Sequence, residues 1–148
     1  MKKHYWITVT VLFVLAHFLC TAQIQFEKGA AFKMLKGSQA GSLPANWMTS
    51  GFDDGIWPEA PAPFRYGDGS GGTLLSDMRN GYSTLYLRSQ FRVSHLADLK
   101  TVSFDCSFDD GFILWINGKE AIRNNAPENP TSESYSPVNH EWDTPFVL

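Results

Sequence analysis

Apolar and polar side chains alternate with a period of two in several short segments, and this alternation predicts β-strands. The clearest segment is 83–93, where leucine, phenylalanine and valine at odd positions alternate with polar and tyrosine side chains at even positions. Segments 99–108, 112–116 and 119–123 continue the pattern, and an earlier strand is predicted at 31–36. Stretches with apolar residues at helical spacing and caps at both ends are scarce. The pattern therefore predicts an all-β protein built mainly from antiparallel strands.

Asn117-Gly118 separates two of these segments, 112–116 and 119–123. A two-residue type I′ turn needs positive φ at both central residues, and Asn-Gly adopts it readily. Trp115 shares its side of the first segment with Ile113, opposite Leu114. The sequence predicts a β-hairpin here, with one side against the core and the other partly covered.

The long stretch 37–81 contains prolines and a glycine-rich run at 67–72, which predicts irregular structure. It also carries five aromatic side chains, which disordered linkers lack. These are Trp47, Phe52, Trp57, Phe64 and Tyr66. We predict an ordered loop region held by its rings, with Trp47 and Trp57 in the core.

The N-terminus has the three parts of a secretory signal peptide: basic residues, an apolar run at 7–19 and small residues before a cleavage site. The run is shorter than the roughly 20 residues that span a bilayer. We predict a signal peptide at 1–22, and hence a secreted or cell-surface protein. Cys20 leaves a lipoprotein as an alternative, although Leu19 before it is bulkier than such a site prefers.

The remaining segment, 23–148, is long enough for one domain. Removal of Lys2 and Lys3 would take the net charge from −3 to −5, and the other basic residues are scattered. A nucleic-acid partner would favour a basic stripe, so none is expected. Only Cys106 would remain, which fits a small core residue better than a nucleophile.

Residues 142–148 begin a strand and stop after its third apolar residue. A sandwich ending there would leave an unpaired edge. We therefore expect the natural protein to continue, with its last strand and further domains absent from this chain.

Several ordered motifs resemble a block found in secreted bacterial proteins. The first part is Trp47 followed by 51–57 (Gly-Phe-Asp-Asp-Gly-Ile-Trp) and 60–69 (Ala-Pro-Ala-Pro-Phe-Arg-Tyr-Gly-Asp-Gly). The second is 86–88 (Tyr-Leu-Arg), Phe91, 109–112 (Asp-Asp-Gly-Phe), 115–120 (Trp-Ile-Asn-Gly-Lys-Glu) and 123–124 (Arg-Asn). Together they resemble the galactose-binding-like jelly-roll domains. The resemblance implies an antiparallel β-sandwich of about eight strands with an accessory, often carbohydrate-binding, role.

Paired aspartates before glycine could bind Ca²⁺, a hard cation that takes six to eight oxygen ligands. The candidate metal ligands are Asp53, Asp54, Asp68, Asp109 and Asp110, with Asp77 as a further donor. The alternative is turn chemistry, since aspartate caps its own backbone and glycine supplies positive φ. We expect no required cofactor, with structural Ca²⁺ left open.

Sugar binding needs exposed rings that stack on pyranose faces, with planar polar groups nearby. The candidate ligand-binding residues are Tyr66, Arg88, Trp115, Asn117, Arg123 and Asn124. The alternative for any ring is a place in the core.

Catalysis is not predicted. The paired aspartates are adjacent, whereas glycosidase carboxylates flank a bond about 5 to 10 Å apart. Nucleophile elbows, paired metal-binding histidines and phosphate loops are missing from the sequence. The sequence thus predicts a non-catalytic carbohydrate-binding accessory module, with a glycan or cell-surface polysaccharide as partner. The alternative is a structural or protein-docking sandwich that positions a downstream catalytic domain.

Overall fold

The computed structural model describes residues 29–41, 43–67, 69–93, 104–141 and 146–147. The predicted signal peptide, residues 99–103 of a predicted strand, Asp68 and the expected missing strand lie outside these ranges. Within them, the regular secondary structure is almost entirely β, with a single helical turn, α1 (Gly37–Ala40). The prediction of an all-β protein is therefore confirmed. No helix in the described ranges is long and apolar enough to cross a bilayer.

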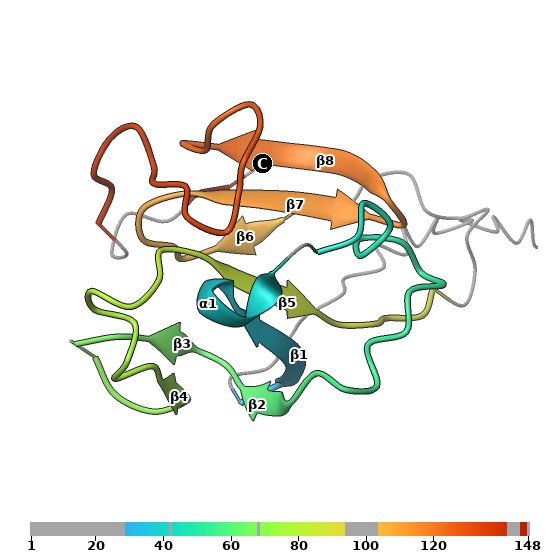
Figure 1. Cartoon of the computed structure of the whole chain (residues 1–148), viewed down its shortest axis with the longest axis horizontal. Coiled ribbons are helices and arrows are strands. Elements are labelled where there is room, and N and C mark those ends of the chain that lie inside the picture. The colour runs from blue at the N-terminus through green and yellow to red at the C-terminus, as the bar shows by residue number, and fades with distance from the viewer. Residues whose placement is uncertain (1–28, 42, 68, 94–103, 142–145, 148) are drawn as a thin grey trace, which may run out of the picture.

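A three-stranded antiparallel sheet is built around β1 (Ala31–Lys36), the strand predicted at 31–36. β2 (Glu59–Pro61) pairs with its first half, and β5 (Leu85–Arg88) pairs with its second half. In Figure 1, α1 lies beside β1 and β5. The sheet thus joins β1 to partners that lie 26 to 55 positions away in sequence.

β7 (Phe112–Ile116) and β8 (Lys119–Asn124) form the predicted hairpin. Asn117 and Gly118 connect them with φ of 51° and 82°, as a type I′ turn requires. The pairing register shifts between Leu114 and Trp115, where Ala121 of β8 has no paired residue on β7. Ring contacts lie on both sides of β7, because Phe112 packs against Phe104 and Phe108 whereas Trp115 packs against Trp47.

The remaining strands are short. β3 (Phe64–Arg65) and β4 (Thr73–Leu74) pair in parallel across the glycine-rich run, and β6 (Asp105–Cys106) pairs antiparallel with β9 (Phe146–Val147). The stretch 37–81 is therefore less irregular than predicted, since it holds α1, β2, β3 and β4.

Two predicted strands are shorter than their alternation suggests. Of the strand predicted at 83–93, only residues 85–88 form a strand, β5, and its pairing with β1 ends at the pair Lys33 and Arg88. Ser89 follows and breaks the apolar side of the segment. The described part of the strand predicted at 99–108 is β6 alone.

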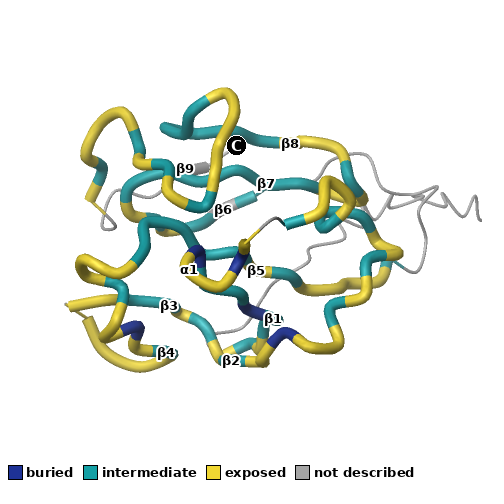
Figure 2. The backbone as a smooth tube through the Cα atoms, viewed as in Figure 1, coloured by how far each residue is buried: buried dark blue, intermediate teal, exposed yellow. Residues whose placement is uncertain are grey.

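Trp47 lies where the two larger sheets meet. Its ring centroid is 5.2 Å from Tyr86 on β5, 5.3 Å from Trp115 on β7 and 6.4 Å from Trp57. Trp57 is buried, and Trp47 is half-buried. Both were predicted in the core, and the structure confirms this for Trp57, whereas Trp47 is only half-buried among its ring contacts. Other buried side chains are few, as the sparse dark segments of Figure 2 show.

Candidate functional site

Arg88 and Asp54, proposed from the sequence for different ligands, contact each other. Arg88 Nε donates to Asp54 Oδ2 over 2.8 Å, with side-chain exposures of only 11% and 21%. Arg88 Nη1 donates to the carbonyls of Trp47 and Thr49, and the guanidinium lies 5.2 Å from the centroid of the Phe52 ring. The guanidinium therefore serves to fix the loop 47–54 against β5.

Asp53 has the geometry of the turn alternative. Its Oδ1 accepts the backbone N–H of Gly55 over 2.9 Å, which closes an Asx turn. The second aspartate pair also organises backbone. Asp110 Oδ1 accepts the N–H of His140 over 2.9 Å, and the Asp110 carbonyl accepts Asn125 Nδ2 over 2.9 Å.

Asp109 stands in an acidic neighbourhood. Burial raises the pKa of the Asp109 carboxyl, and the nearby carboxylates of Asp110 and Glu141 raise it further. In the part of the chain that the structure describes, no three His, Cys, Asp or Glu side chains form a group that could hold a metal ion. Calcium binding therefore stays a prediction.

Two more of the candidate ligand residues have internal contacts. Arg123 forms a two-point ion pair with Glu120, at 2.8 and 2.6 Å, and also donates to the Pro127 carbonyl. The hydrogen bonds from Arg123 lower the pKa of Glu120. Trp115 is half-buried against Trp47.

Asn117, Asn124 and Tyr66 differ in their exposure. Asn117 is exposed in the hairpin turn, and Asn124 is half-buried where β8 pairs with Phe112. Tyr66 directly follows β3 and is 47% exposed. Beside it, Arg65 Nε donates to the Gly71 carbonyl over 2.9 Å and so fixes the glycine-rich loop. Among the six candidate ligand residues, Tyr66 is the exposed ring.

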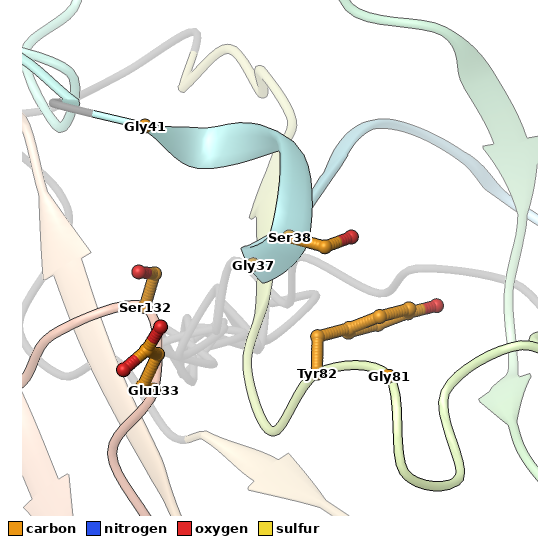
Figure 3. Close-up of a pocket in the computed structure, with 7 residues that line it drawn as sticks. All are labelled: Gly37, Ser38, Gly41, Gly81, Tyr82, Ser132 and Glu133. Carbon is orange, nitrogen blue, oxygen red and sulfur yellow. The ribbon is translucent and has the colours of Figure 1, made fainter.

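A pocket of about 290 Å³ lies at a different place, which no sequence motif indicated. It is lined by Gly37, Ser38, Gly41, Gly81, Tyr82, Ser132 and Glu133. Figure 3 shows Ser132 and Glu133 on one side, and Tyr82 with α1 on the other. These residues come from three segments far apart in sequence, so spacing could not associate them.

Close backbone contacts hold the walls of this pocket together. Gly37 N–H donates to the Thr84 carbonyl over 2.9 Å, and Thr84 Oγ1 donates to the Ser132 carbonyl. A Cβ atom on Gly37 would overlap both Thr84 and Ser132. Glycine at 37 therefore lets the loop at 132 approach α1.

Tyr82 is fixed from the side away from Ser132 and Glu133. Its hydroxyl donates to Asp77 Oδ1 over 3.2 Å, and Lys36 Nζ pairs with Asp77 Oδ2 over 2.7 Å. Burial, together with the charge of Asp77, raises the pKa of Tyr82 to about 12. The hydrogen bond to Asp77 holds the ring in this orientation.

Comparison with known proteins gave no match: no family model fits the chain, and no curated protein or solved structure is significantly similar to it. The resemblance to galactose-binding-like domains consequently stays a prediction from the sequence motifs.

Proposed function

We propose that this chain is a non-catalytic, carbohydrate-binding-like accessory module of a secreted protein, with the jelly-roll sandwich of the galactose-binding-like domains. The observation that carries the proposal is the exposed ring of Tyr66 beside the glycine-rich loop. Rings in this setting stack on the apolar face of a sugar, while nearby polar groups take up its hydroxyls.

The all-β framework supports this function. The ring contacts of Trp47, which do not include Tyr66, hold the loop 47–57 against β5 and β7. Tyr66 lies between β3 and a loop tied back by Arg65, which gives the ring a fixed base. A ring fixed at its base loses little conformational entropy when it binds.

The proposal is tested by affinity electrophoresis of the full chain in native gels that contain galactan, xylan or β-glucan. We expect retardation in at least one gel, and we expect Tyr66→Leu to lose most of it while Tyr66→Trp keeps it. Leucine retains apolar area but offers no ring face, so this pair separates stacking from general stickiness.

Leu74→Ala is the matched control, because Leu74 on β4 has a similar exposure of 51% but no ring. It should migrate like the unmodified chain. Migration of the folded chain unchanged by all three polysaccharides would overturn the proposed function.

A structural or protein-docking module is the second candidate, and a specific observation favours it. Arg88, Arg123 and Trp115, half of the candidate ligand residues, are engaged within the chain. Leu87 on β5 and Phe91 after it are partly exposed, at 38% and 47%. Failure in every gel, with the fold intact, would favour this candidate.

A further inference from the structure

We infer that the pocket between α1, Tyr82 and Glu133 is a binding site for a single neutral sugar ring. This site is separate from Tyr66 and involves none of the residues that the sequence motifs suggested. The inference rests on the proposed function in one respect, the choice of a sugar among small polyhydroxylated molecules.

The size of the pocket suits one small ligand. Its volume of about 290 Å³ lies close to the lower limit of small-molecule sites, about 300 Å³. Gly37 is buried at its base, whereas Ser38, Gly41 and Glu133 are exposed. A ligand would therefore enter past Ser38 and Glu133 and reach backbone at the base.

The lining excludes two classes of ligand. The described residues that line the pocket include no Lys or Arg, the nearby Lys36 ammonium is already paired with Asp77 over 2.7 Å, and the Glu133 carboxylate would repel an anion. Apart from the Tyr82 ring, the lining offers serine hydroxyls, a carboxylate and glycine backbone, with no aliphatic side chain. An anion would lose its solvation there without a compensating cation, and a fully apolar ligand would leave the polar groups of the lining without hydrogen-bond partners.

A sugar ring fits what remains. Its hydroxyl groups can donate to the Glu133 carboxylate and exchange hydrogen bonds with the two serines. Hydrogen bonds to a carboxylate are the stronger kind. The C–H face of the ring can pack on Tyr82, whose hydroxyl is bonded to Asp77 on the side away from Glu133 (Figure 3).

A simple amine is the competing small ligand, because a carboxylate and a ring also suit a cation. The ammonium group of Lys36 already lies 5.8 Å from the centroid of the Tyr82 ring. Lys36 therefore already occupies a position over this ring that the ammonium group of an amine would take. The lining therefore favours the neutral ligand.

The test uses saturation-transfer NMR on the full chain with D-glucose, D-galactose, D-mannose and N-acetyl-D-glucosamine, and with ethanolamine as the amine probe. Calorimetry then gives Kd for the sugar with the strongest transfer. We expect transfer to at least one sugar, and Kd raised by about tenfold or more in Glu133→Gln. Tyr82→Leu should have a similar effect, whereas Tyr82→Phe should keep affinity because it keeps the ring.

Glu128→Gln is the matched control, since Glu128 is exposed after β8 but does not line the pocket. Glu133 is also exposed, so Glu133→Gln should fold even where a change at Tyr82 does not. No transfer to any sugar, or transfer to ethanolamine alone, would overturn the inference. Sugar binding unchanged in Glu133→Gln would also overturn it, while polysaccharide retardation through Tyr66 could still stand.

Discussion

At the scale of single residues, the guanidinium of Arg88 joins β5 to the loop 47–54. It forms an ion pair with Asp54 and donates hydrogen bonds to the backbone carbonyls of Trp47 and Thr49. The planar guanidinium group holds its N–H donors in a rigid fork and can serve several acceptors at once, whereas a lysine ammonium is a point charge on a flexible stem. Removal of Arg88 would therefore leave the Asp54 carboxylate and two backbone carbonyls without their donor, and this loss would account for most of the destabilisation.

Arg88→Met should lower the free energy of unfolding by about 3 kcal/mol, because it leaves the Asp54 carboxylate without its cation in a largely covered place. Urea unfolding measures this. Arg92→Met is the matched control, since Arg92 is exposed and its loss should change stability by less than about 0.5 kcal/mol. Equal stability of the two variants would show that the Arg88 contacts contribute little.

Tyr82 gives a prediction for alkaline pH. Its pKa is raised to about 12 by burial and by Asp77, so the folded state holds the phenol proton more tightly than the unfolded chain. Stability should therefore fall as pH rises from about 10 to about 12, and this contribution should vanish in Tyr82→Phe.

Phenolate absorbance during a pH titration measures the effect directly. Asp77→Asn should lower the pKa of Tyr82 without restoring the ordinary value, because burial, the larger cause, remains. A titration curve that is the same with and without Asp77 would contradict the described contact.

At the scale of elements, the β7–β8 hairpin depends on its two turn residues. Gly118 has φ of 82°, and a Cβ there would lie 3.1 Å from Thr49 Cγ2. The turn therefore packs closely against the loop that Arg88 fixes. A side chain at 118 would be opposed both by its own backbone and by Thr49.

Gly118→Ala should destabilise the protein by about 1–2 kcal/mol, the usual cost of a left-handed conformation for an L-residue. Asn117→Gly should cost less, because glycine readily adopts positive φ. Thermal unfolding of the two variants side by side measures the difference. Equal melting temperatures for Gly118→Ala and Asn117→Gly would show that the positive φ of Gly118 does not limit the stability of the hairpin.

At the scale of the whole molecule, the sequence predicted the parts that depend on local pattern. The strand at 31–36, the Asn-Gly turn and the burial of Trp57 follow from alternation, turn chemistry and composition. The structure departs from prediction where distant segments decide the outcome. Arg88 lies on the polar side of its segment, yet its side chain is largely buried because it contacts Asp54 and two backbone carbonyls. Nothing near Arg88 in the sequence indicates this.

The pocket was missed for the same reason. Tyr82 and Glu133 are 51 positions apart, and neither belongs to a motif. What brings their segments together is the absence of a side chain at Gly37, which lets the loop at 132 approach α1. A glycine that permits close approach has no local signature, because glycine is also common in turns.

Trp47 couples the two larger sheets, and this leads to the prediction that concerns the molecule as a whole. Its ring contacts Tyr86 on β5, Trp115 on β7 and Trp57 in the intervening loop. Few side chains are buried in the described part of the chain, and this one ring contacts both sheets. Trp47→Ala should cost about 3 kcal/mol or more. Hydrogen exchange should show amides of β5 and of β7 losing protection together, since each sheet would lose the same neighbour. Ile56→Ala, in the same loop but 93% exposed, should leave both sheets protected. Loss of protection in one sheet alone after Trp47→Ala would mean that the sheets are stabilised separately and that the ring does not join them.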